Sequence, residues 1–254
     1  MGYSFESRVR YSEIGEDKRL TMTGLLNYFQ DCTTFHSEAV GRGMEVLESI
    51  RHVWVLSSWQ IFVNRYPKLG EHIVVSTWPY DFKGFYGSRN FELKTADGEQ
   101  LAYANSLWSF LNLETGMPAR ILPEELAAYR LEEKLDMDYA PRKIRVPEHT
   151  VQRETFTVKP HHLDTNHHVN NGQYVSMARD CFREDFTIRQ LRVEYKRQAL
   201  LGDQIIPYLA AEGDRYVVSL NNPDGQPYAI VEFTVKARQQ SGDGFCTSGY
   251  WKMK

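Results

Sequence analysis

The sequence predicts an α+β fold in which one unit, a long helix followed by several antiparallel strands, occurs twice along the 254 residues. Two observations predict this fold. Two segments 149 positions apart carry the same helix-forming pattern. Strand-like runs follow each of them, and in each copy an Asp-Gly turn separates two of these runs. Two copies of one unit explain both observations better than chance does.

The two helices superimpose without a gap when the sequence is shifted by 149 positions. Residues 20–26 then face residues 169–175, and Cys32 falls on Cys181. In the second copy, apolar residues recur at the spacing of a helix that lies on a core. We therefore expect helices over residues 23–41 and 173–182. Both cysteines lie on the apolar stripe, so we expect buried small side chains rather than nucleophiles.

Strand-like runs rich in Val, Ile, Trp, Phe and Tyr accompany each helix, as suits a half-buried pleated surface. Asp97-Gly98 and Asp224-Gly225 each lie between two such runs, as a hairpin turn should. A curved antiparallel sheet wrapped around a central helix, present twice, is a tandem double hotdog. The expected strands are residues 4–11, 53–66, 72–81, 84–95 and 101–112, then 153–159, 186–197, 203–212, 215–221 and 228–238, with 244–254 as a candidate for one more.

A connector separates the two copies. Residues 118–148 hold four prolines and a charged stretch over residues 124–134, in which Pro123 could begin a surface helix. We place the domain boundary near residue 145. The expected units are an N-terminal hotdog with connector, 1–145, and a C-terminal hotdog, 146–254.

The composition excludes several classes of function. Hydrophobic residues make up 42% of the chain, which allows a sizeable core, and the net charge of −3 with dispersed cations offers no nucleic-acid groove. The amino terminus lacks an apolar signal segment, and no apolar run is long enough to span a membrane. Three widely separated cysteines form neither a disulfide framework nor a metal site. We expect a cytoplasmic protein without a metal or cofactor.

The strongest candidate site is the polar stretch just before the second helix. Asp164, Asn166 and His168 occupy every second position, so in an extended segment their side chains would point the same way. Asn170 is a suitable N-cap, which places the three side chains at the donor-rich start of the helix. A carboxylate, an amide and an imidazole together can polarise a water molecule. On spacing alone, such a run is more often a loop than an active site.

The run Asp164-x-Asn166-x-His168-Val169-Asn170-Asn171 resembles the active-site signature of the acyl-acyl carrier protein thioesterases, the family of the plant fatty-acyl-ACP hydrolases and their bacterial relatives. The N-terminal half is similar to that family's first domain, and the similarity spans roughly residues 5–210. The residues that carry this second similarity are Trp54-Val55-Leu56, Gln60, Arg65-Tyr66-Pro67, Gly70, Thr77-Trp78 and Ala104-Asn105-Ser106-Leu107-Trp108.

The resemblance implies hydrolysis of fatty acyl thioesters on acyl carrier protein, which releases free fatty acid and ends chain elongation. It also implies that the first hotdog holds the acyl chain and the second supplies the catalytic residues. We expect Leu25, Phe29 and Trp108 to contact the acyl chain. A glutamate of the family's site is replaced here by Gln198, next to Ala199 where plant members often carry cysteine. A Cys-His mechanism is therefore not available at that position.

The expected catalytic residues are Asp164, Asn166, His168 and Gln198. Asp164, His168 or both would polarise water that Gln198 helps to hold, or Glu194 would take the place of the missing carboxylate. Asn166 and the N–H groups at the helix terminus would bind the carbonyl oxygen. An acidic carrier protein would meet a basic face, for which the candidates are Lys83, Arg89, Lys196 and Arg197.

Three other functions are considered. Among enzymes, the near alternative is a thioesterase for acyl-coenzyme A or another small thioester, which a comparison of one acyl group on carrier protein and on coenzyme A would distinguish. A non-catalytic sensor of acyl thioesters would have no use for a water-activating group, and a hotdog dehydratase would keep a different arrangement of histidine and acid. Whether two chains form a homodimer is left open by the sequence.

Overall fold

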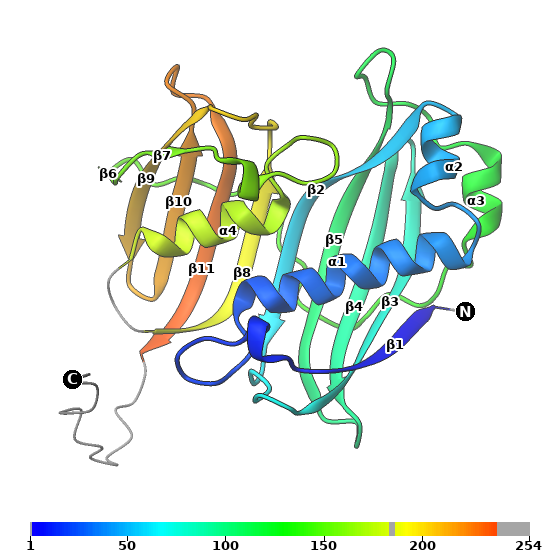
Figure 1. Ribbon diagram of the computed structural model, residues 1–254, viewed down its shortest axis with the longest axis horizontal. Helices are drawn as coiled ribbons and strands as arrows, with labels where there is room; N and C mark the ends of the chain where they lie inside the picture. Colours follow the sequence, from blue (N-terminus) through cyan, green and yellow to red (C-terminus); the bar gives the residue numbers. More distant parts are fainter. Residues whose placement is uncertain (1, 183–185, 238–254) are drawn as a thin grey trace, which may run out of the picture.

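The structure, a computed structural model, describes residues 2–182 and 186–237 (Figure 1). The described strands form one antiparallel sheet in the order β1-β3-β4-β5-β2-β8-β11-β10-β9-β6, and β7 pairs with β9. The two copies share this sheet because β2 (His52–Val63) pairs with β8 (Phe186–Tyr195). The long helices of both copies lie on the same face of the sheet. The tandem double hotdog that the sequence predicts is confirmed.

Both copies follow the expected order of helix and strands. The other elements of the first half are β1 (Tyr3–Arg8), η1 (Tyr11–Glu13), α1 (Met22–Ala39), α2 (Met44–Ser49), β3 (His72–Lys83), β4 (Tyr86–Thr95), β5 (Gln100–Asn112) and α3 (Pro123–Ala128). Those of the second half are β6 (Val151–Gln152), β7 (Phe156–Thr157), η2 (Pro160–His162), α4 (Asn171–Asp180), β9 (Gln204–Glu212), β10 (Arg215–Asn221) and β11 (Pro227–Ala237).

The two central helices begin in the same way. The Thr21 side chain accepts a hydrogen bond from the Gly24 N–H at 3.0 Å, and the Asn170 side chain accepts one from the Gly172 N–H at 2.8 Å. Each cap satisfies a donor that the first turn of a helix leaves free. The two caps are 149 positions apart, which is the offset that the sequence predicts.

The internal repeat extends to single backbone hydrogen bonds. The N–H of Gly70 donates to the Val9 carbonyl at 2.9 Å, and the N–H of Gly202 donates to the Val158 carbonyl at 3.0 Å. Both glycines have a positive φ, of 79° and 86°, which a residue without a Cβ adopts easily. The two halves therefore share turns as well as helices and strands.

The second half departs from the expected strand over residues 153–159. The short strand β6 ends just before this range, and within it only the two residues of β7 form a strand. The break between them lies opposite Pro207 of β9, whose carbonyl accepts from the Arg153 N–H at 2.9 Å. Proline has no N–H to donate to a neighbouring strand, so a continuous ladder cannot form at this position. The expected strand at 244–254 lies outside the described residues.

The connector contains a shorter helix than its charged stretch suggests. Helix α3 begins at Pro123, as expected, but ends at Ala128, and α2 was not predicted. Further along, the Gln60 side chain bonds both the Asp138 carbonyl and the Ala140 N–H at 2.9 Å. The connector is thereby fastened to the sheet. Within the described residues, none of the helices is both long and apolar enough to span a bilayer.

Candidate functional site

The segment before α4 is a tight loop and not the extended segment that the sequence suggested. Leu163 and Val169 pair to close the loop, and the Asp164 N–H donates to the His168 carbonyl at 2.8 Å. His167 has a φ of 61°, the left-handed region that few side chains adopt. The expectation that Asp164, Asn166 and His168 project together from a strand is therefore wrong.

The Asp164 carboxylate explains this conformation. Its Oδ1 accepts hydrogen bonds from the backbone N–H groups of Asn166 at 2.8 Å and His168 at 3.2 Å. Short acidic side chains often bond the nearby backbone in this way and so compete with extended structure. One oxygen of the proposed catalytic carboxylate thus also holds the loop together.

The three predicted side chains differ in their surroundings. Asp164 and His168 are half-buried, whereas Asn166 is exposed. The Nδ1 atom of His168 is buried and has no hydrogen-bond partner among the described residues. A buried ring nitrogen without a partner costs free energy, which a water or substrate atom could recover. The loop thus brings a carboxylate and an unsatisfied imidazole to the start of α4.

Gln198 lies next to Ala199, whose backbone forms hydrogen bonds with the end of this loop and with α4. The Val169 N–H donates to the Ala199 carbonyl at 3.0 Å, and the Tyr174 hydroxyl accepts from the Ala199 N–H at 2.9 Å. The Gln198 side chain itself is exposed. The structure therefore places Gln198 beside the loop, as a candidate that faces solvent.

Glu194 cannot replace the missing glutamate of this site. Its neighbour Tyr195 donates a hydrogen bond from its hydroxyl to the Asn171 carbonyl in α4, and successive strand residues point to opposite faces. Glu194 is 4% exposed and accepts from the Ile144 N–H of the connector at 3.1 Å, with Lys196 at 2.8 Å. Its carboxylate fastens the connector on the face away from α4.

The residues expected to contact the acyl chain lie in the core of the first half. Leu25 and Phe29 are buried between α1 and the sheet, and the Phe29 ring lies 5.2 Å from that of Phe91 between centroids. Trp108 is half-buried on the same core, opposite Leu56 of β2. The structure thus groups the three residues around one apolar interior.

One of the expected surface cations is buried. Arg89 is 6% exposed, and its Nη2 lies 2.6 Å from the Nδ1 of His36, which is 3% exposed. The guanidinium also lies over the Tyr129 ring, 5.5 Å from its centroid. Arg89 therefore forms no part of a basic face, and Lys196 is paired with Glu194. Lys83 and Arg197 are exposed.

The two cysteines behave as the sequence predicts. Both are buried, and burial raises the pKa of the Cys32 thiol to about 12 and that of the Cys181 thiol to about 11. Such thiols are protonated at neutral pH and so are poor nucleophiles. Within residues 2–182 and 186–237, no three His, Cys, Asp or Glu side chains gather closely enough to hold a metal ion.

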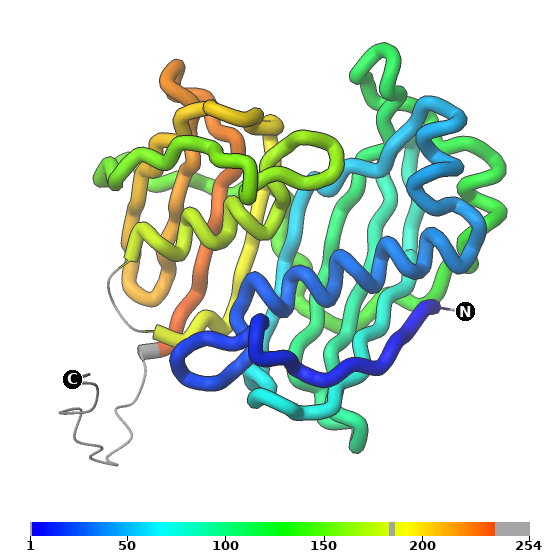
Figure 2. Tube along the Cα trace, in the orientation of Figure 1, coloured from blue at the N-terminus to red at the C-terminus, as the bar shows by residue number. Residues whose placement is uncertain are grey.

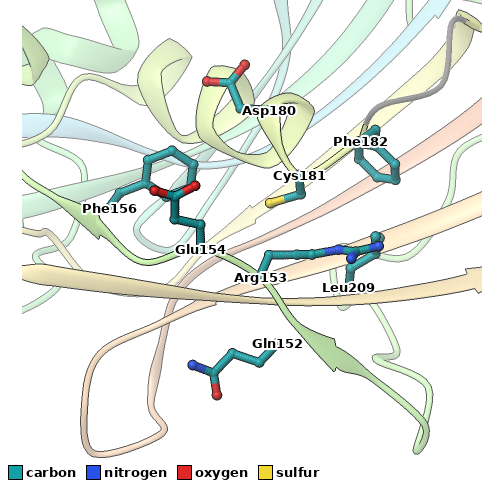
Figure 3. A pocket seen from close by; sticks show the side chains of 8 residues that line it. All are labelled: Gln152, Arg153, Glu154, Phe156, Asp180, Cys181, Phe182 and Leu209. Carbon is teal, nitrogen blue, oxygen red and sulfur yellow. The ribbon is translucent and has the colours of Figure 1, made fainter.

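A pocket of about 610 Å³ opens at the far end of α4 from the candidate loop (Figure 3). It lies where α4 ends after 10 residues, whereas α1 continues for 18. None of the predicted site residues lines it. Its lining residues are Gln152, Arg153, Glu154, Phe156, Asp180, Cys181, Phe182 and Leu209.

Residues of α1, in the first half, also lie beside the candidate site, and the sequence did not predict them. Helices α1 and α4 meet near their N-termini, where the hydroxyls of Thr23 and Ser176 lie 3.0 Å apart. Asn27 of α1 lies against Gly172 in the first turn of α4. The only signal for this contact is the 149-residue offset, because it pairs position 23 with 172 and 27 with 176.

Comparison with sequence families gives two matches. The model described as the acyl-ACP thioesterase N-terminal domain matches residues 2–129, and that of the C-terminal domain matches residues 146–231. The chain is 29% identical to the acyl-[acyl-carrier-protein] hydrolase FATB3 of Cuphea viscosissima, over 98% of this chain and 66% of the relative. It is 24% identical to the oleoyl-acyl carrier protein thioesterase 2 of Arabidopsis thaliana, over 86% of this chain. The chain spans no more than 66% of the length of either relative.

Two solved structures are similar along most of the chain. An acyl-ACP thioesterase from Bacteroides thetaiotaomicron superimposes with a TM-score of 0.84 at 24% identity, over 92% of this chain and 97% of that one. The 12:0-ACP thioesterase from Umbellularia californica gives a TM-score of 0.80 at 21% identity, over 93% and 98%. At these identities the likeness establishes the fold.

Proposed function

Because the chain belongs to the acyl-ACP thioesterase family, we propose that it hydrolyses fatty acyl thioesters carried on acyl carrier protein. The products are free fatty acid and free carrier protein, which ends elongation of that chain. One observation supports the proposal most directly. Asp164 is held beside His168 at the start of α4, and the His168 ring carries a buried nitrogen that has no hydrogen-bond partner in the described part of the chain.

The proposed reaction needs an activated water and a place for negative charge to develop. Asp164 Oδ1 is occupied by backbone N–H groups, which leaves Oδ2 and the His168 ring to polarise the water. The water oxygen forms a bond to the carbonyl carbon while Asp164 or His168 takes one of the water protons. The carbon–sulfur bond then breaks, and the leaving thiolate takes that proton from the same group. The N-terminus of α4 and the Asn166 amide stabilise the carbonyl oxygen as it becomes negative.

The acyl chain occupies the apolar interior of the first half in this proposal. Trp108 is half-buried and so lies nearer the entrance, whereas Leu25 and Phe29 are buried deeper. A chain that reaches Phe29 displaces part of the packing against Phe91. The exposed Gln198 holds water beside the loop. It accepts and donates hydrogen bonds but has no charge with which to remove a proton.

The proposal also covers the domain boundary, the location and the partner of the chain. The boundary between an acyl-binding unit, 1–145, and a catalytic unit, 146–254, lies near residue 145 in the connector. We propose a cytoplasmic location, although the curated relatives named above are described as chloroplastic. Acyl carrier protein is the proposed partner, and a homodimer is left open.

A hydrolysis assay tests the function. The wild type and His168→Ala are compared on acyl carrier protein loaded with chains from short to long, and on coenzyme A carrying the same acyl groups. We expect fast wild-type turnover on the carrier protein that the variant loses. Faster turnover on coenzyme A would favour an acyl-coenzyme A thioesterase, and binding without turnover would favour a sensor.

A further inference from the structure

The contact between α1 and α4 is built on the internal repeat but is not symmetric. Positions 23 and 27 of α1 correspond to positions 172 and 176 of α4 through the offset of 149 residues. A two-fold arrangement would therefore contain the pair 23–176 and its mate 27–172. The first pair is Thr23 and Ser176, which are hydrogen-bonded at 3.0 Å, and the second is Asn27 and Gly172.

In the second pair, Asn27 can approach α4 closely because Gly172 has no side chain. A Cβ atom on Gly172 would lie 3.3 Å from Asn27 Oδ1 and 3.3 Å from a methyl carbon of Thr23. Without that atom, the Asn27 carboxamide lies over the first turn of the helix. Gly172 is four residues after His168, and its N–H donates the capping hydrogen bond to the Asn170 side chain. Asn27 thus reaches from α1 of the first half to the first turn of α4, which directly follows the candidate loop. The Cα traces of the two helices lie on the same face of the sheet (Figure 2).

The Asn27 side chain is available for a ligand. It is exposed, and within the described residues its carboxamide has no hydrogen-bond partner, whereas the Ser176 hydroxyl at the equivalent position is occupied. A carboxamide offers two donors and an acceptor, which together match the N–H and C=O of a secondary amide. A purely structural role for Asn27 would be to join α1 and α4 by a hydrogen bond. Thr23 and Ser176 already form such a bond between the two helices.

We propose that Asn27 is a positioning residue whose carboxamide hydrogen-bonds the amide of the thioester's pantetheine arm nearest to the sulfur. The inference rests on the proposed function. With the thioester carbonyl at the start of α4 and the acyl chain inside the first half, the thiol side must leave toward solvent. Two methylene groups separate the sulfur from that amide, so the amide passes near the helix start, where the exposed Asn27 lies.

Two small substrates separate this role from a structural one. An acyl N-acetylcysteamine thioester contains the nearest amide of the arm, and the acyl propyl thioester with the same acyl group contains none. We expect Asn27→Ala in the full chain to lower kcat/KM for the first substrate about tenfold, mainly through KM, which is the loss of one or two hydrogen bonds. The propyl thioester should keep a kcat/KM within about twofold of the wild type.

Ser176→Ala is the matched control. It removes the hydrogen bond between Thr23 and Ser176 at the same helix contact, so any effect of loosening the contact should change kcat/KM for both substrates equally. If Asn27→Ala lowered kcat/KM equally for both substrates, the proposal would be overturned in favour of a structural role. An unchanged kcat/KM for both substrates would overturn it as well. A wild type that hydrolyses neither substrate, nor acyl carrier protein thioesters, would instead overturn the proposed function and this inference with it.

Discussion

Asp164 Oδ1 accepts a hydrogen bond from the backbone N–H of His168 at 3.2 Å, so one proposed catalytic group positions the backbone of the other. A substitution at Asp164 therefore changes structure and chemistry together unless it preserves this acceptor. Asparagine preserves the oxygen and removes the charge, whereas alanine removes both. The pair of variants separates the two roles.

We expect Asp164→Asn to fold with wild-type stability and to lose about 10²-fold in kcat, because it cannot take a proton from water. Asp164→Ala should lose as much activity and also about 1–2 kcal/mol in the free energy of unfolding, because two backbone N–H groups lose their acceptor. Urea unfolding and steady-state kinetics measure the two effects. Wild-type kcat in Asp164→Asn would contradict a catalytic carboxylate.

His168→Gln should lose about 10²–10³-fold in kcat with little change in stability. The buried Nδ1 of His168 has no hydrogen-bond partner in the described part of the chain, so removal of the ring leaves no protein group unsatisfied. A thermal melt within a few degrees of the wild type would show that the variant is folded. Turnover above a tenth of the wild-type rate would exclude the imidazole from the chemistry.

Gln198 tests how much the missing family glutamate matters. Because its side chain is exposed and neutral, we expect Gln198→Ala to lose less than about tenfold in kcat. Gln198→Glu should raise kcat or shift the pH profile of kcat/KM, since a carboxylate there could accept a proton. An alanine variant as inactive as His168→Gln would make Gln198 an essential group instead.

Trp108→Leu should shift the preferred acyl chain without abolishing hydrolysis. The smaller side chain widens the half-buried part of the apolar interior, so the ratio of kcat/KM for longer to shorter chains should rise. Phe29→Ala is the structural contrast, because truncating a fully buried phenylalanine costs about 3–5 kcal/mol of stability. An unchanged chain profile in Trp108→Leu would remove Trp108 from the acyl site.

The buried pair of His36 and Arg89 predicts a pH dependence of stability. Burial, and then the Arg89 charge, lower the pKa of His36 from 6.5 to about 4. The unfolded chain therefore binds a proton below pH 6.5 that the native chain does not bind. The neutral His36 therefore contributes to the free energy of unfolding, and this contribution is fully present above pH 6.5. It is lost as the pH falls toward 4, which lowers the free energy of unfolding by on the order of 2–3 kcal/mol.

His36→Gln isolates this effect, because glutamine keeps an acceptor for Arg89 but does not titrate. Urea unfolding of both proteins between pH 7 and pH 4 measures it. The variant should lose less stability than the wild type over this interval. Parallel curves for the two proteins would show that His36 does not cause the dependence.

Much of the fold follows from local sequence signals. The helix cap Asn170, most of the strands, and the hairpin glycines Gly98 and Gly225, with φ of 91° and 77°, lie where the sequence places them. Caps, alternation and turn residues act over a few positions, so each can be recognised from its own segment. The candidate residues Asp164 and His168 could be found for the same reason.

Other features were decided only by tertiary structure. The position of the loop before α4 depends on the hydrogen bond from the Val169 N–H to the Ala199 carbonyl, which joins two separate segments of the second half. The burial of Arg89 and the meeting of Asn27 with Gly172 depend on contacts between segments far apart in the chain. The sequence by itself determined the two repeated units and the residues that precede α4. Only the packing of α1 against α4 on one shared sheet decided what surrounds those residues, because long-range contacts leave no local pattern.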